Sequence, residues 1–224
     1  MESDRLTCKN AVEEYVYDIR SKIHGDLSDF ITEDVRGKYS NELEDSENWL
    51  YEEGEDVEKK VYVEKLKSLQ VLGEAVKQRK QEYDGRENAF NSFGHSLNMA
   101  TKVIEAFKAG DEKYAHLDGE AVQKVSNMIG EKKEWLNASI HTLSNLDKTS
   151  DPSILLSAFF DEKKSFEAFA TPILNKAKPK VEPPKEPEPE NPPSQQPPPT
   201  SEEPPKAPNN SNAGEDPAQG MAVD

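Results

Sequence analysis

The residues of this chain that could do chemistry are four histidines, a single cysteine and one short run of carboxylates. His24, His95, His116 and His141 lie in separate segments, without the paired spacing that places two imidazoles on one helix face around a zinc ion. Cys8 has no sequence signature of a nucleophile, and a single cysteine forms no internal disulfide. We therefore interpret the histidines as surface or packing residues and expect no catalytic residue and no metal site.

The carboxylates gather between residues 52 and 56, in the run Glu-Glu-Gly-Glu-Asp. This run lacks the alternating acid and amide positions and the terminal glutamate of a helix-loop-helix calcium site. We interpret it as a solvated turn in which Asp56 caps the following helix. The eleven glycines of the chain are scattered and form no phosphate loop, so we expect no cofactor, and in particular no ATP or ADP, to bind here.

Charge and hydropathy exclude several classes of protein. The formal net charge is −16, and the lysines are interspersed with acids, so nucleic acid is not an expected partner. No run of about 18 apolar residues exists to cross a membrane, and the first twenty residues lack the basic start and apolar stretch of a signal peptide. A lone cysteine fits a reducing compartment, and we expect a cytoplasmic protein with the nucleus as a second location.

The composition divides the chain near Pro179. Residues 179–224 hold 14 of the 16 prolines, no aromatic residue, and three lysines against nine acids. Such a segment buries too little apolar surface to offset its ordering entropy, and we expect a disordered, acidic, proline-rich tail. Residues 1–178 carry 25 basic and 35 acidic residues and are long enough for one helical-bundle domain.

Residues 1–178 are expected to be all-α, because apolar residues recur at spacings of three and four throughout. Thr32 and Asp118 are expected to cap the second and fifth helices, and Asp151 with Pro152 to open the sixth, which ends between Pro172 and Leu174. The pair Asp84 and Gly85 is a turn signal, expected to end the third helix. About six amphipathic helices joined by short connections predict an antiparallel bundle.

Several blocks of sequence resemble, in order, the C-terminal helical region of the large, 110-kDa branch of the 70-kDa heat-shock protein superfamily. The blocks are residues 9–20, 43–45 with 47–56, 61–66, 116–118, 134–136, and 172–174 with 176 and 178–184. Their signature residues are Tyr15, Trp49, Leu50, Tyr51, Gly54, Tyr62, Trp135, Leu136 and Pro172. Those at positions 49–51, 135 and 136 continue helix stripes, so we expect them to pack between helices and not to contact a partner.

This resemblance implies the lid bundle of a chaperone that acts as a nucleotide-exchange factor. The implied partners are the ATPase domain of a 70-kDa heat-shock chaperone and unfolded client proteins. The family's ATPase and β-sandwich domains have no counterpart in this sequence, which looks like the C-terminal piece of a larger chaperone. We therefore expect binding without ATPase activity, since nucleotide binding belongs to the missing domain.

A different class of protein stays open from the sequence. A helical scaffold or trafficking adaptor could share the bundle, and its proline-rich tail would offer Pro183, Pro184 and residues 197–199 as extended ligands for aromatic-lined domains. The final pair, Val223 and Asp224, matches the end of the acidic tetrapeptide by which cytosolic relatives dock helical-repeat co-chaperones. The acids that precede this pair in those relatives are missing here.

Overall fold

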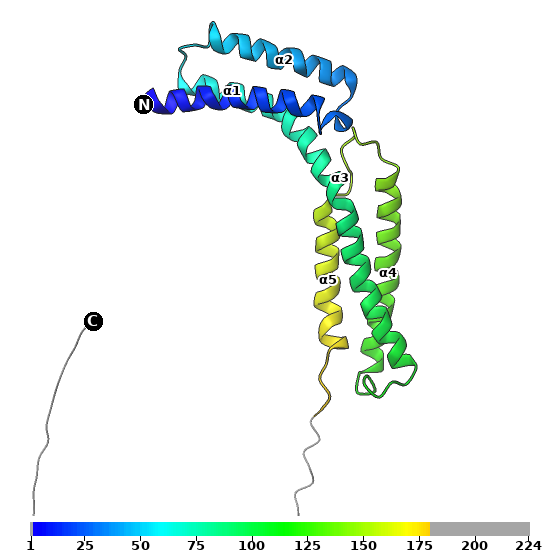
Figure 1. The fold of residues 1–224 in the computed structure, drawn as a ribbon. Coiled ribbons are helices and arrows are strands. Elements are labelled where there is room, and N and C mark those ends of the chain that lie inside the picture. The colour runs from blue at the N-terminus through cyan, green and yellow to red at the C-terminus, as the bar shows by residue number, and fades with distance from the viewer. Residues whose placement is uncertain (1, 180–224) are drawn as a thin grey trace, which may run out of the picture. The chain divides into compact units, whose positions relative to one another are not determined.

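The structure, a computed structural model, describes residues 2–179. The described chain contains five α-helices, one 3-10 helix and no strand (Figure 1). The elements are α1 (Glu2–His24), η1 (Ser28–Phe30), α2 (Glu33–Tyr51), α3 (Lys59–Lys108), α4 (Gly119–Ser144) and α5 (Leu156–Leu174). The predicted all-α bundle is confirmed, with five helices in place of six. Residues 1–180 form one compact unit, whereas the expected tail lies outside the described residues.

The missing sixth helix is explained by α3, which runs without a break through the turn expected at Asp84 and Gly85. That prediction was wrong because the glycine serves packing and not a turn. A Cβ atom at Gly85 would collide with the side chain of Leu156, at the start of α5. The glycine thus lets α5 approach α3 closely, which offsets its cost of about 1 kcal/mol in a helix interior.

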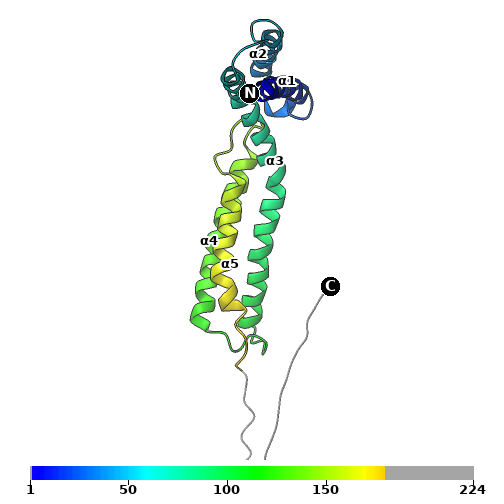
Figure 2. The same ribbon diagram turned by 90° about the vertical axis from the view of Figure 1, so that its left-hand side faces the viewer.

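Two separate apolar cores are built along α3. The first, here called the N-terminal cluster, consists of buried residues between Val12 and Val76, from α1, η1, α2 and the first part of α3. The second, the C-terminal cluster, consists of buried residues between Ala89 and Leu174, from the rest of α3, α4 and α5. Figure 2 shows α4 and α5 running beside the second part of α3. Each core therefore uses one continuous stretch of chain.

The expected helix caps were partly right. The Asp118 carboxylate accepts a hydrogen bond from the Glu120 amide at 3.2 Å, as predicted for the start of α4. Thr32 does stand at the cap position of α2, but its side chain makes no capping bond, and its carbonyl accepts from the Arg36 amide at 2.8 Å.

The start of α5 differs from the prediction. The helix begins at Leu156 and not at Asp151 and Pro152. Its first amide donates to the Glu82 carboxylate at 2.7 Å, so a side chain from α3 satisfies it across the bundle. Asp151 pairs with Arg79. No sequence signal next to the helix start could reveal a cap that comes from another helix.

No described helix combines the length and the apolar composition that crossing a membrane requires.

Candidate partner-binding surface

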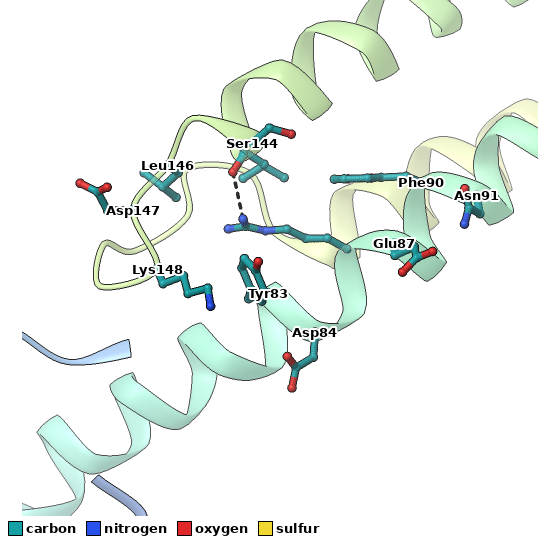
Figure 3. Close-up of a pocket in the computed structure, with 11 residues that line it drawn as sticks. Tyr83, Asp84, Glu87, Phe90, Asn91, Ser144, Leu146, Asp147 and Lys148 are labelled. Carbon is teal, nitrogen blue, oxygen red and sulfur yellow. Dashed lines mark hydrogen bonds between the residues drawn. The ribbon is translucent and has the colours of Figure 1, made fainter. Parts of the chain in front are cut away.

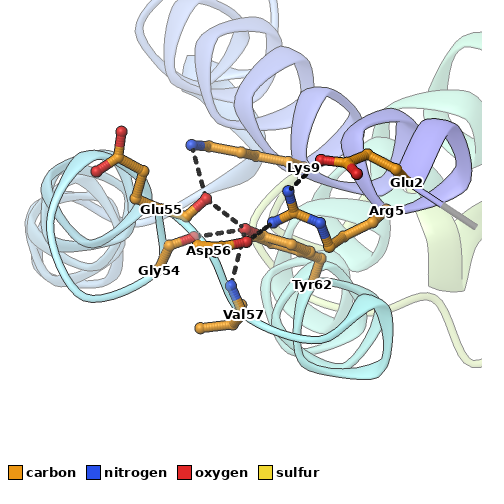
Figure 4. Close-up of polar contacts among 8 residues, drawn as sticks. All are labelled: Glu2, Arg5, Lys9, Gly54, Glu55, Asp56, Val57 and Tyr62. Carbon is orange, nitrogen blue, oxygen red and sulfur yellow. Dashed lines mark hydrogen bonds and ion pairs between the residues drawn. The ribbon is translucent and has the colours of Figure 1, made fainter.

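The acidic turn between α2 and α3 is fixed by α1 and by the start of α3 (Figure 4). The buried Tyr62 hydroxyl donates to the Gly54 carbonyl at 2.6 Å and accepts from the Val57 amide at 3.4 Å. Asp56 forms an ion pair with Arg5 of α1. Asp56 therefore does not cap α3, whose cap position is occupied by the next acid, Glu58. Its ion pair holds the turn against α1.

Gly54 has a packing reason to be glycine. Its Cα lies under the Trp49 ring, so a Cβ atom there would approach two ring carbons to 2.6 Å. The Trp49 ring meets the Tyr62 ring edge-on at 5.8 Å between centroids, and the Lys65 ammonium lies 5.4 Å from the Trp49 centroid. Leu50, the next residue, is buried in the N-terminal cluster. These signature residues position α2 against α3.

Four further signature residues lie outside that turn. Tyr15 packs partly buried against the N-terminal cluster. Trp135 packs in the C-terminal cluster against Phe159, with 5.0 Å between ring centroids, and Leu136 is buried there as well. Pro172 is exposed, inside the last turn of α5. The structure thus divides the signature between the two cores.

Tyr51 is the exception among the residues expected to pack between helices, since 56% of it is exposed. It marks a surface that we call the tyrosine face, made of Glu13, Tyr17, Arg20, Glu47 and Tyr51 from α1 and α2. Tyr17 is also exposed, at 44%. The expectation for Tyr51 was wrong because the helix turns this ring outward while the neighbouring Leu50 points into the core.

Polar contacts hold the side chains of the tyrosine face in place. The Tyr17 hydroxyl donates to Glu47 Oε1 at 2.5 Å, and Arg20 Nη1 donates to Glu47 Oε2 at 2.6 Å. The Arg20 guanidinium also lies 5.2 Å from the centroid of the Tyr17 ring. On the other side, the Tyr51 hydroxyl donates to Glu13. Both tyrosines are therefore tied to carboxylates of the neighbouring helix.

These contacts change the acidity of the groups involved. Hydrogen bonds from Tyr17 and then Arg20 lower the pKa of Glu47, because both favour the carboxylate. The same bond raises the pKa of Tyr17, and the bond to Glu13 raises the pKa of Tyr51. At neutral pH the tyrosine face therefore presents two neutral phenols, and the carboxylate of Glu47 that holds Tyr17 is ionised.

Sequence reasoning missed this surface, although a signal was available. The buried stripe of α1 consists of Val12, Val16, Ile19 and Ile23. Tyr17 falls outside that stripe, and an aromatic residue on the polar side of an amphipathic helix is a candidate contact residue.

The described residues define an all-helical domain with a preformed aromatic surface. Nowhere between residues 2 and 179 do three or more histidine, cysteine or acidic side chains gather as metal ligands would. Chemically, the arrangement can bind a macromolecule.

Comparison with known proteins gives the family. No family model and no solved structure matches the chain. It is 40% identical over 186 residues to human heat shock 70 kDa protein 4L, covering 83% of this chain and 22% of the relative. It is 41% identical over 182 residues to rat heat shock 70 kDa protein 4, covering 81% and 22%. Heat shock protein 110 of Caenorhabditis elegans is 38% identical over 188 residues, covering 84% and 24%.

This chain is therefore homologous, over most of its length, to one segment of the heat-shock 110 and heat-shock 70 kDa protein 4 branch of the 70-kDa heat-shock superfamily. The resemblance seen in the sequence blocks is confirmed. The chain spans about a fifth of the length of the human and rat relatives.

Proposed function

We propose that this chain is a non-enzymatic chaperone module that binds the ATPase domain of a 70-kDa heat-shock partner through the tyrosine face. Its homology to heat-shock proteins supports the class of function. The observation that carries the choice of surface is the pair of exposed tyrosines, Tyr17 and Tyr51, each hydrogen-bonded to a carboxylate of the neighbouring helix. We further propose that the module assists in holding unfolded proteins.

The tyrosine face has the chemistry of an interface centre. Tyrosine and arginine are enriched among the residues that dominate binding energy. A side chain that is already held in one conformation loses little entropy when a partner covers it. Glu13 and Glu47 add negative charge, so the complementary surface on the partner carries lysine or arginine.

The mechanism follows from differential affinity. A module that binds the open, nucleotide-free ATPase domain more tightly than the closed domain shifts its partner towards the open form and speeds ADP release. In the family, an ATPase domain adds to this contact. We propose that the present chain alone binds more weakly, accelerates ADP release poorly, and neither binds nor hydrolyses nucleotide.

Calorimetric titration of the full chain against a nucleotide-free ATPase domain from a 70-kDa heat-shock chaperone tests the proposal. We expect Tyr51→Ala and Tyr17→Ala each to weaken binding by at least about tenfold, which corresponds to about 1.4 kcal/mol. Phe160→Ala is the matched control, because Phe160 of α5 is an aromatic residue exposed to the same 44% as Tyr17.

Absence of binding by the unaltered chain would overturn the proposed partner. If Phe160→Ala lowered the affinity for the ATPase domain as much as the tyrosine variants do, the choice of surface would be overturned. A parallel stopped-flow measurement of ADP release, with heat-denatured chain as the blank, reports whether binding is linked to exchange.

A further inference from the structure

The middle of α3 belongs to neither core. Along this 50-residue helix, no residue between Val76 of the N-terminal cluster and Ala89 of the C-terminal cluster is buried. Most helical stability in proteins comes from the packing of an apolar face, and this stretch of about three turns has little such packing. Gly85, the residue with the lowest helix propensity apart from proline, lies within it. The helix is therefore easiest to bend between its two cores.

Polar contacts bridge the two cores across this stretch. The Lys148 ammonium, from the connection between α4 and α5, pairs with Asp29 of η1 at 2.9 Å. Arg79 of α3 pairs with Asp151 of the same connection at 2.6 Å, and it also donates to the Phe30 carbonyl at 3.2 Å. Arg79 thus contacts residues from both sides of the gap, and Lys148 joins the α4–α5 connection to η1.

Aromatic rings fill the space between these ion pairs. The Phe30 ring meets the Tyr83 ring edge-on at 5.6 Å between centroids. The Lys148 ammonium lies 4.9 Å from the Tyr83 centroid and 5.7 Å from that of Phe30. Lys148 therefore makes three contacts at once, one with a carboxylate and two with aromatic faces.

We propose that Asp29, Phe30, Arg79, Tyr83, Lys148 and Asp151 form a polar latch that fixes the orientation of the two cores about a bendable segment of α3. With the latch closed, the cores behave as one cooperative unit. With the latch open, they reorient and unfold independently. The latch is sensitive to salt, because its ion pairs are solvated: the side chains of Asp29 and Asp151 are 65% and 76% exposed.

The space beside the latch supports movement of this kind. A cleft of about 980 Å³ lies between α3 and the start of the α4–α5 connection, and Lys148, Tyr83, Arg86 and Leu146 help to line it (Figure 3). Arg86 donates to the Leu143 carbonyl at 2.9 Å, but its buried Nε has no hydrogen-bond partner. The part of the connection around Lys148 thus borders open space, whereas Leu146 at its start packs against the C-terminal cluster.

The two tryptophans of the chain provide a direct test, because Trp49 packs on the N-terminal cluster and Trp135 on the C-terminal cluster. Trp49→Phe and Trp135→Phe give two single-tryptophan proteins whose fluorescence each reports one core during urea unfolding. With the latch residues unaltered, we expect the two single-tryptophan proteins to unfold at the same urea concentration at low salt. Adding Asp29→Asn with Asp151→Asn should separate the two midpoints by about 0.5 M urea or more.

The matched control is Asp18→Asn with Glu64→Gln, which changes the net charge equally but removes ion pairs within single helices. Its two transitions should stay coincident. Coincident transitions in the latch variant, or separate transitions when the latch is intact, would overturn the proposal.

A second measurement does not depend on the tryptophan substitutions. Spin labels on Asn41→Cys in α2 and Lys124→Cys in α4, with Cys8→Ser, report the distance between the cores by electron-electron double resonance. We expect one narrow distribution with the latch intact and a broad one in the latch variant or at about 1 M salt, where charges are screened within about 3 Å. Distributions that stay narrow in both cases would also refute the latch.

Discussion

Gly73 of α3 is the position at which a single methyl group should have the clearest effect on folding. The hydroxyl oxygens of Tyr15 and Tyr39 and the side chain of Ile19 crowd against its Cα. A Cβ atom at Gly73 would overlap the Tyr15 hydroxyl and lie 2.8 Å from that of Tyr39 and 3.1 Å from Ile19. The Tyr39 hydroxyl also donates to the Leu69 carbonyl at 2.6 Å, so it cannot move without breaking that buried bond.

Gly73→Ala therefore combines two opposing contributions to stability. Alanine is favoured over glycine in a helix interior by about 1 kcal/mol. Overpacking costs about 1–3 kcal/mol, and a buried hydroxyl or carbonyl left without its partner costs about 1–3 kcal/mol more. We expect the free energy of unfolding to fall by about 1–5 kcal/mol.

Gly130→Ala in α4 is the matched control, because no atom lies within 4 Å of a Cβ built there. Only the helix propensity acts at that position, so we expect a gain of about 0.5–1 kcal/mol. Urea unfolding followed by circular dichroism and by tryptophan fluorescence measures both variants. If Gly73→Ala proved as stabilising as Gly130→Ala, the steric argument would be refuted.

Two further predictions concern acidic side chains. Hydrogen bonds lower the pKa of Glu47 from its ordinary 4.5, so its ionised form stabilises the fold above that pH and the contribution is lost as the pH falls through the lower folded-state value. Urea unfolding at a series of pH values should show the stability difference between the unaltered chain and Glu47→Gln shrinking towards acid; a difference independent of pH would contradict the assignment. Asp118→Ala removes the cap of α4 and should cost about 1 kcal/mol, whereas Thr32→Ser, at a cap position without a side-chain bond, should change the midpoint little.

Periodicity was sufficient to predict most of this fold. The apolar residues at spacings of three and four between Phe90 and Phe107 pack in or against the C-terminal cluster, and those at positions 12, 16, 19 and 23 are buried in the N-terminal cluster. Spacings of three and four report which face of a helix meets a core, whatever that core contains. Asp118 was also predictable, because its capping bond involves an amide two residues away.

The errors arose where distant residues determine the local structure. Asp84 and Gly85 were predicted to form a turn, because the local sequence does not reveal that Leu156 packs onto the glycine. Asp151 and Asp56 were predicted to cap helices. Instead, Asp151 pairs with Arg79 and Asp56 pairs with Arg5, and both arginines are distant in the sequence. Tyr51 was expected to pack between helices because it continues the apolar pattern of its helix. In all these cases the deciding partner belongs to another helix.

The continuous stretch of chain that builds each core has a consequence for biosynthesis. Every buried residue of the N-terminal cluster precedes position 77, so this part can collapse while the later helices are still inside the ribosome. The second part of α3 would then emerge as an extension of a helix that is already anchored, which removes the need for a new nucleus. The two cores can therefore fold in the order of their synthesis, the N-terminal cluster first and the C-terminal cluster second, with α3 extending from one to the other.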